Sequence, residues 1–336
     1  MKPFVTRLAI FLAIQGVIAA ALFCNSRYNT QYGFMAAFED KIQLLKDHDE
    51  PHLIVVGGSN IIFGIDSPIL EQEIGLPTIN TGLHAGLGLQ LLLDITEEYA
   101  RPGDVILLIP EYPLLSSRMY ASDNCTQELI RQNRSGWKHM RHNPGFSLKD
   151  YIDNRGLSDI AFQLQAGFKY YSDERDQRKR QYASQPGAYT RLNFNSNGDF
   201  VGHHGQPQAD ELRDIHRRFY FFPSYYAKTT AAINDCAAAV EAKGAKMYFA
   251  YCPVPESVYK RSGDSLAKAH QYLKQHLTIP VLHAPEETRY PESCFYDTSC
   301  HLNEATKYER TKLVAKSLQR QFMVLSRRTK QQGKLR

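Results

Sequence analysis

The stretch of residues 52–66 constrains the fold more than any other part of the chain. Residues 53–56 form a short, β-branched apolar run without charge, as expected of a strand buried on both faces of a parallel sheet. Gly57 and Gly58 end the run, and glycine permits a sharp turn that leaves backbone amides uncovered. Ser59 follows at once, so its hydroxyl is expected above the carboxyl end of the strand, beside amide donors. A plain Gly-Gly-Ser turn without function would carry the same letters.

Similar apolar runs recur along the chain and alternate with stretches of helical periodicity. Further strands are expected at residues 76–80, 105–109, 247–251 and 280–283, and helices at residues 66–75, 87–99, 225–242, 265–277 and 305–322. Short apolar strands that alternate with helices predict an α/β fold, in which a parallel sheet is covered on both faces to give three layers, α/β/α. The length of 336 residues allows one large or two ordinary domains.

Residues 1–24 are expected to direct export. Lys2 and Arg7 form a positive flank ahead of residues 8–23, which are almost entirely apolar. As a helix, residues 8–23 would span roughly 24 Å, short of a ~30 Å hydrocarbon core unless flanking residues contribute, so length does not decide between anchor and signal peptide. Because Phe23 makes a poor cleavage site, we favour an uncleaved single-pass transmembrane anchor over a cleaved signal peptide or a buried core helix.

The remaining chain divides by composition. Residues 25–50 are polar around one helical run and are expected to form a stalk, and residues 51–325 hold the α/β domain. Within that domain, residues 114–222 are polar and aromatic and interrupt the alternation, so we expect an insertion over the face that carries Ser59, with aromatic platforms able to face a glycan. Residues 326–336 are basic and are expected to be disordered.

A second chemical group lies near the other end of the chain. Residues 294–302 read Cys-Phe-Tyr-Asp-Thr-Ser-Cys-His-Leu and precede the last expected helix. His301 can take a proton from a serine hydroxyl, and Asp297 can orient His301. Ser59, His301 and Asp297 are therefore the candidate catalytic residues.

A serine after the first strand, with an Asp and a His just before the last helix, resembles the SGNH, or GDSL-like, hydrolase superfamily. The chain looks most similar to its membrane-anchored cell-envelope branch, which includes the D-alanyl transfer and alginate O-acetylation proteins. The resemblance covers residues 53–113 and 247–318. His301-Leu-Asn303 is similar to the His-Pro-Asn of the superfamily, whereas three residues separate Asp297 from His301 in place of the usual two. The resemblance implies a flavodoxin-like arrangement of the three layers and serine esterase or O-acyltransferase chemistry.

The resemblance also implies an oxyanion hole beside the serine. Gly58 belongs to the first loop, and Gly82 or Gly86 of the second loop could supply a backbone amide, with Gly86 preferred on spacing. After the third strand the superfamily usually carries an Asn that donates to the oxyanion. This chain carries Glu111 and Tyr112 instead. A carboxylate such as that of Glu111 cannot donate unless it is protonated, whereas the Tyr112 hydroxyl can donate. The departure favours the envelope branch over soluble esterases and also suits a catalytically inactive relative.

Several other partners and ligands are not expected. A formal net charge of +5 without a nucleic-acid-binding motif, behind an export segment, argues against nucleic acid. His203-His204 has no carboxylate or cysteine at ligand spacing, so we assign no metal and no cofactor. Six cysteines in an exported chain permit disulfides, and Cys294 and Cys300 could close a small loop around Asp297 or remain as two thiols.

Together these residues predict an extracytoplasmic, membrane-anchored serine enzyme that adds or removes an ester-linked acyl group, such as acetyl, on an envelope or exported polysaccharide. Transfer and hydrolysis differ only in whether a sugar hydroxyl or water attacks the acyl-enzyme. The alternative from another class is a catalytically inactive glycan-binding or scaffold partner of a multi-spanning membrane acyltransferase. A lipase or thioesterase is weaker, because no long apolar acyl channel is legible in the sequence.

The positive flank generates a topology prediction. Because Lys2 and Arg7 precede the hydrophobic helix, the residues after it should lie on the periplasmic side of the inner membrane. A reporter that is active only in the periplasm, fused after Arg336, should therefore be active. Activity confined to a reporter that works only in the cytoplasm would reverse the assignment.

Overall fold

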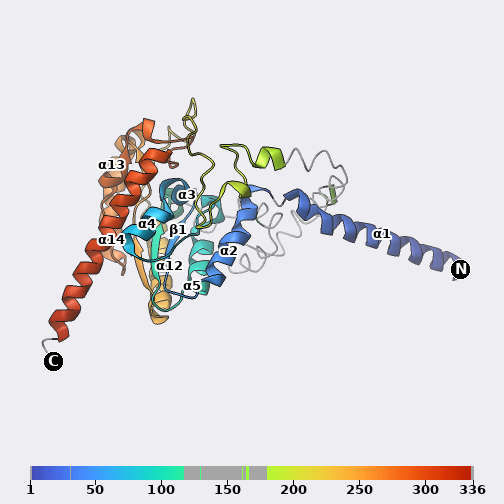
Figure 1. Cartoon of the computed structure of the whole chain (residues 1–336), viewed down its shortest axis with the longest axis horizontal. Helices are drawn as coiled ribbons and strands as arrows, with labels where there is room; N and C mark the ends of the chain where they lie inside the picture. Colours follow the sequence, from blue (N-terminus) through green and yellow to red (C-terminus); the bar gives the residue numbers. More distant parts are fainter. Residues whose placement is uncertain are drawn as a thin grey trace.

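A computed structural model describes residues 2–30, 32–116 and 180–333, together with residues 129, 161, 164 and 165 (Figure 1). Most of the expected insertion at residues 114–222 lies outside the described residues, including its tyrosines at 170 and 171 and most of its basic run at 175–180. The carboxyl-terminal part of that stretch, from residue 180 onward, is described.

The centre of the fold is a parallel sheet of four strands in the order β2-β1-β3-β4. The strands are β1 (Leu53–Gly57), β2 (Thr78–Asn80), β3 (Val105–Ile109) and β4 (Lys246–Phe249). Every pairing is parallel, which confirms the predicted α/β class and the parallel sheet. The strand expected at residues 280–283 is reduced to one parallel bridge between Phe249 and Val281. A separate small pair joins β5 (Val254–Pro255) to β6 (Arg289–Tyr290).

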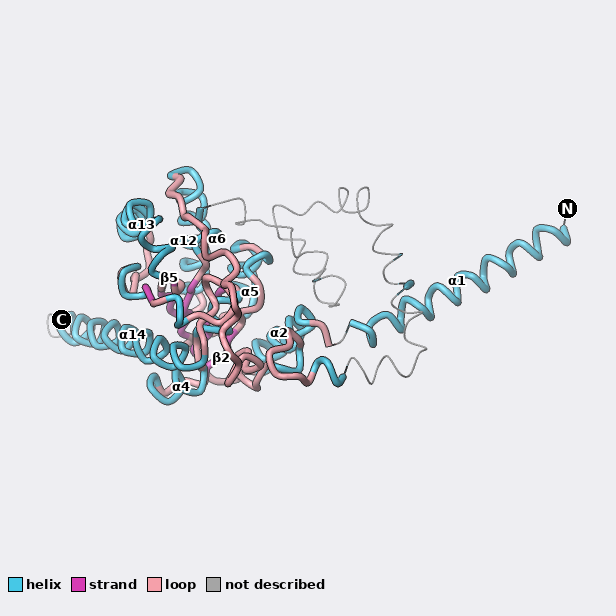
Figure 2. The backbone as a smooth tube through the Cα atoms, turned by 90° about the horizontal axis from the view of Figure 1, so that it is seen from above, coloured by secondary structure: helices cyan, strands magenta, loops and turns pink. Residues whose placement is uncertain are grey.

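Helices lie on two sides of the sheet. They are α3 (Ser59–Gly64), α4 (Ser67–Ile74), α5 (Leu89–Tyr99), α6 (Tyr112–Ser116), α12 (Pro223–Ala242), α13 (Glu256–His276) and α14 (Glu304–Gly333), with 3₁₀ turns η1 (Phe34–Ala36), η2 (Ala85–Leu87), η5 (Arg191–Asn193), η6 (Pro285–Thr288) and η7 (Glu292–Cys294). α5 packs against α12, and α14 packs against α3 and α4. Figure 2 shows the strands between these two groups, an arrangement compatible with the expected three layers.

Local sequence explains where α4 begins and ends. The Asp66 carboxylate accepts a hydrogen bond from the Ile69 amide at 3.0 Å and so caps the first turn. Gly75 ends the helix in the left-handed region, at φ 77°, where only glycine is free of strain. Both signals are legible in the sequence, and the predicted helix at residues 66–75 matches the observed one closely.

α13 begins earlier than the sequence indicated. The Ser262-Gly263 pair predicts a turn ahead of the helix expected at residues 265–277, whereas α13 runs without interruption from Glu256 to His276. Its buried face includes Val258, Ser262 and Leu266, so the amphipathic stripe passes through the glycine. A tertiary contact on that stripe outweighs the roughly 1 kcal/mol that an internal glycine costs.

α14 also exceeds its predicted length. The helix continues to Gly333, into the stretch at residues 326–336 that was expected to be disordered. Arg, Lys and Gln dominate that stretch, and these residues have high helix propensity, which lets the last turns continue from a packed helix.

The chain begins with two helices of different character. α1 (Lys2–Thr30) includes a 19-residue apolar segment, Pro3–Ala21, which is entirely exposed and is long and apolar enough to span a membrane or act as a signal anchor. α1 projects away from the body of the protein (Figure 1). α2 (Ala37–Asp47), by contrast, buries Phe38, Ile42 and Leu45 in the main core. The expected stalk therefore docks on the domain through α2.

The core predicts which substitutions the fold cannot absorb. Leu107 is fully buried at the centre of β3, so Leu107→Ala should lower the free energy of unfolding by about 2–5 kcal/mol, through lost burial and a residual cavity. Leu192→Ala, at a leucine that is 48% exposed, is the matched control and should cost less than about 0.5 kcal/mol. Urea unfolding followed by circular dichroism measures both, and equal losses would contradict this account of the core.

Candidate active site

At the end of β1, Gly57 and Gly58 have no room for a larger side chain. A Cβ on Gly57 would lie 2.5 Å from the carbonyl oxygen of Ile109, and a Cβ on Gly58 would lie 2.5 Å from a carboxylate oxygen of Glu111. The close approach of the end of β3 therefore requires the Gly-Gly pair. Ser59, which is 9% exposed, follows as the first residue of α3.

Glu111 holds this turn from the neighbouring strand. Its buried carboxylate accepts hydrogen bonds from the amides of Gly58, at 3.2 Å, and Asn60, at 3.0 Å. Asn60 in turn donates from its side chain to the Ile109 carbonyl at 2.9 Å. A carboxylate at the amino end of a helix is favoured by the helix dipole, so Glu111 stabilises the conformation that presents Ser59.

A tight loop brings Asp297 and His301 together despite their unusual spacing. The Tyr296 amide donates to the His301 carbonyl at 2.8 Å, and an antiparallel bridge joins Phe295 to Leu302. The loop thereby turns both side chains to the same side, and His301 Nδ1 lies 2.8 Å from Asp297 Oδ1. Because a carboxylate accepts, Nδ1 donates and Nε2 faces away from Asp297.

Two residues of the stretch from 180 to 222, which sequence reasoning did not single out, complete the surroundings of Asp297. The Tyr189 hydroxyl donates to Asp297 Oδ2 at 2.7 Å, and Arg213 forms an ion pair with the same oxygen. Burial raises the pKa of Asp297, but its hydrogen bonds with His301, Tyr189 and Arg213 outweigh burial and lower the pKa to about 2. Asp297 is therefore ionised over the physiological range. Nothing in the sequence near Tyr189 or Arg213 indicates that either residue contacts Asp297.

The Tyr189 ring also contacts the segment that follows α1. Its centroid lies 5.4 Å from that of Phe34, and Phe34 packs in turn against Phe194 and Phe200. Gly33 forms an antiparallel bridge with Thr190. The first residues after α1 are therefore in contact with the residue that holds Asp297.

His301 lies flat on α3, on the side that carries Ser59. Its ring stacks on Phe63 with centroids 4.0 Å apart and planes 7° from parallel. Phe63 is one helical turn after Ser59, and residues four apart share a helix face. Nε2 of His301 is buried and has no hydrogen-bond partner among the described residues, so Ser59 does not bond to it in this structure. Burial lowers the pKa of His301, but Cys300 and Asp297 raise it, to about 9.

The glycines expected to form the oxyanion hole have their amides engaged elsewhere. The Gly82 amide donates to the Asn80 side chain at 3.1 Å, and the Gly86 amide donates to Nδ1 of His84 at 2.9 Å. The amide nitrogen of Ala85 lies close to the Ser59 turn, since a Cβ on Gly58 would be 2.7 Å from it. Ala85 is thus a backbone donor of the second loop beside this turn, which glycine spacing could not indicate.

Tyr112 does not lie beside Ser59, where it was expected as a donor to the oxyanion. Its ring is buried in the main core, with its centroid 4.8 Å from that of Phe219 and 6.0 Å from that of Tyr251. Burial raises the pKa of its hydroxyl well above the usual value, and that hydroxyl has no partner among the described residues. No described contact joins Tyr112 to Ser59, and the place beside the turn is taken by Glu111.

Of the two alternatives for Cys294 and Cys300, a disulfide or two thiols, the structure shows two free thiols. The loop is already closed by its backbone hydrogen bonds and by the Asp297–His301 pair, so a covalent link is not needed to hold it. The thiol of Cys300 lies 3.5 Å from the Thr298 hydroxyl.

In comparisons with known proteins, no protein-family model matches the chain, and none of the curated proteins matches it. The argument for chemistry therefore rests on the site itself. A carboxylate–imidazole pair with one unpartnered ring nitrogen packs on the short helix that begins with Ser59, and these are groups suited to activating a hydroxyl.

The pair makes stability depend on pH. In the folded chain the pKa of Asp297 is lowered to about 2 and that of His301 is raised to about 9. The pair therefore stabilises the fold fully between about pH 4 and about pH 6.5, and its contribution is lost as pH falls through about 2 or rises through about 9. Asp297→Asn should lower the free energy of unfolding by on the order of 3 kcal/mol at about pH 6, and by less toward either extreme.

Urea unfolding of the two proteins across this pH range measures the difference. Asp210→Asn, at an exposed aspartate, is the control and should show no such dependence. A loss in Asp297→Asn that is independent of pH would mean that the pair does not titrate as a unit.

Proposed function

We propose that the chain is an extracytoplasmic, SGNH-like serine enzyme that adds or removes an acyl ester on a polysaccharide. The observation that carries the proposal is the Asp297–His301 pair, whose imidazole stacks on Phe63, one helical turn after Ser59, and whose Nε2 has no hydrogen-bond partner among the described residues. A partnered imidazole with one unpaired nitrogen beside a serine turn is what nucleophilic catalysis by a hydroxyl requires.

The reaction would proceed in two halves. The reacting form has a neutral His301, and its share grows as the pH approaches the raised pKa of about 9. In that form the Ser59 hydroxyl adds to the ester carbonyl carbon and passes its proton to His301 Nε2, and Asp297 stabilises the resulting imidazolium. The tetrahedral intermediate then expels the alcohol, which takes the proton back from Nε2, and leaves an acyl-enzyme. A sugar hydroxyl or water attacks this ester as Nε2 takes its proton, and Nε2 returns that proton to the Ser59 oxygen when the second intermediate collapses.

The oxyanion of each intermediate needs donors close to Ser59. The amides of Ser59 and Ala85 make no hydrogen bond to other described residues, and the Ala85 amide lies close to the turn. Glu111 already accepts from the Gly58 and Asn60 amides, so it sets the direction of the turn and is no donor. These two amides are therefore our candidates for the oxyanion hole.

A glycan substrate fits the aromatic character of the surroundings. Tyr189 and Tyr296 are partly exposed, with their rings near that of buried Phe63 beside the Asp297–His301 pair, and Arg213 is exposed next to it. Aromatic faces with polar groups at their edge suit sugar rings and anionic glycans. Anchoring through α1 would place this site outside the inner membrane, where a multi-spanning membrane acyltransferase is the partner we propose for supply of the acyl group.

A second candidate is a catalytically inactive scaffold that binds glycan beside such an acyltransferase. Two observations favour it: the Gly82 and Gly86 amides are both engaged, and Ser59 makes no hydrogen bond to His301. Catalytic hydrogen bonds are often long in a free enzyme and form only with substrate, so the missing Ser59–His301 bond is also compatible with the enzyme.

Covalent labelling separates the two. A fluorophosphonate should label the wild-type protein, because the probe requires a nucleophilic hydroxyl with a base and oxyanion donors. Ser59→Ala should abolish labelling, His301→Ala should slow it by about 10²–10⁴-fold, and Asp297→Asn should slow it by a smaller factor. Ser224→Ala and His216→Ala, at exposed positions, are the matched controls and should label normally.

The same variants should then be tested for acylation of the polysaccharide in a deletion strain. Loss of acylation with Ser59→Ala supports the enzyme. An unlabelled wild type, together with normal acylation by Ser59→Ala, would show that the scaffold reading is correct. Release of acetate without an acceptor glycan, and without stimulation by one, would favour a hydrolase over a transferase.

A further inference from the structure

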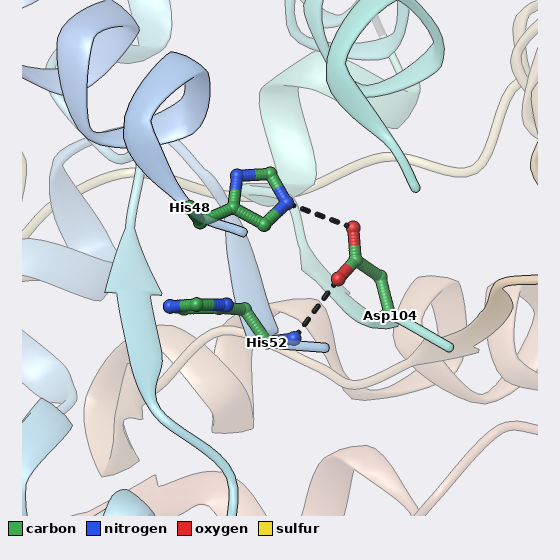
Figure 3. A group of neighbouring side chains, drawn as sticks. All are labelled: His48, His52 and Asp104. Atoms are coloured by element: carbon green, nitrogen blue, oxygen red, sulfur yellow. Dashed lines mark hydrogen bonds and ion pairs between the residues drawn. The ribbon is translucent and has the colours of Figure 1, made fainter. Parts of the chain in front are cut away.

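We propose that His48, His52 and Asp104 form a divalent-cation site, best suited to Zn²⁺, at the end of the sheet opposite Ser59. One ligand atom from each residue lies within 4.8 Å of the others (Figure 3). Imidazole nitrogen and carboxylate oxygen are the donors of three-ligand zinc sites, which complete a tetrahedron with water.

Parallel strands bring the three residues together from distant parts of the sequence. His52 immediately precedes β1 and Asp104 immediately precedes β3, and these strands are neighbours with Leu53 opposite Val105. His48 follows the last residue of α2, which packs on the same core. The group therefore sits where the docked helix meets the amino ends of two strands.

The hydrogen bonds of His48 are incomplete without a cation. Nδ1 lies 2.6 Å from the Leu45 carbonyl, which can only accept, and Nε2 lies 3.2 Å from Asp104 Oδ2, which also accepts. A neutral imidazole has one N–H, so donation to the carbonyl leaves the lone pair of Nε2 facing a carboxylate. A cation between the two groups, either a proton or a metal ion, removes this repulsion.

His52 also donates to a backbone carbonyl, but its ring is turned differently. Its Nδ1 lies 2.5 Å from the Glu50 carbonyl, so Nε2 carries the lone pair, and Figure 3 shows this outer nitrogen pointing away from His48 and Asp104. Rotation of the His52 side chain is therefore needed to bring Nε2 to an ion shared with His48 and Asp104. A metal ion would draw on His52, whose ring lies 4.8 Å from that of His48, whereas an ion pair between His48 and Asp104 would not need it.

Asp104 is held ready to bind. Its Oδ1 accepts from the His52 amide at 2.9 Å and its Oδ2 from the Arg101 amide at 2.8 Å. The His48 and Asp104 side chains are almost fully buried, whereas His52 is partly exposed and leaves a route for an ion. Zinc ligand atoms must approach to about 3.5 Å of one another, and rotation of the accessible His52 ring supplies that movement.

Zinc titration of the full-length protein in detergent tests the site. The protein is purified with a tag that contains no histidine, stripped with a chelator, and titrated with ZnCl₂ in a calorimeter. We expect one Zn²⁺ per chain, and at least about tenfold weaker binding by His52→Ala. His52→Ala keeps the backbone amide that holds Asp104, and His216→Ala, at an exposed histidine, is the matched control and should bind as wild type.

Two further measurements detect the bound ion without calorimetry. Co²⁺ in place of Zn²⁺ should give the visible absorption of a tetrahedral complex with wild type, and Zn²⁺ at about 100 times its Kd should raise the Tm of wild type by several degrees but not that of His52→Ala. Absence of stoichiometric binding, or equal binding by wild type and His52→Ala, would overturn the proposal and leave a proton between His48 and Asp104.

Discussion

The site depends first on the Glu111 carboxylate, which accepts from the backbone on either side of Ser59. These bonds cross from the end of β3 to the end of β1. The pairing of the two parallel strands therefore fixes the position of the turn that carries Ser59. The lack of space at Gly57 and Gly58 follows from the same approach. In the sequence Glu111 departs from the Asn of the superfamily, because an ionised carboxylate cannot donate. Its contribution is to accept, which fixes a turn that two glycines would otherwise leave free.

α14 holds the carboxyl end of α3, the short helix that begins at Ser59. Lys307 and Arg310 of α14 are fully buried, and their side chains donate to carbonyls of α3 at Ile62 and Gly64. Cations are favoured at the carboxyl end of a helix, and each buried carbonyl must find a donor. Because α14 begins three residues after His301, these contacts also limit how far His301 can move from the helix of Ser59. Removal of either cation would leave buried carbonyls unpaired.

Local signals predicted the parts of the fold that local physics determines. The strand at residues 105–109 and the Asp66 cap with the Gly75 stop were legible, because uncharged β-branched runs, caps and glycines act over a few residues. The same reasoning placed a helix break at Gly263 and missed Tyr189, Arg213 and Ala85, since these depend on which distant segments meet. His48 and His52 were missed for a related reason: their shared partner Asp104 is 52 residues from the nearer histidine and reaches it only through strand pairing. Spacing along a chain is informative only inside one element.

The contact of Phe34 with Tyr189 has a consequence for the distance between the reaction and the bilayer. From the end of the apolar segment at Ala21 to Phe34 there are nine helical residues and four more, roughly 30 Å of chain at most. In a chain anchored through α1, the site would then be confined to a thin layer above the membrane surface. If the chain is the enzyme proposed above, polymer emerging from the bilayer would meet it at high local concentration, and polymer already released would rarely reach it. The place of acylation along an export route would thus follow from the length of a tether.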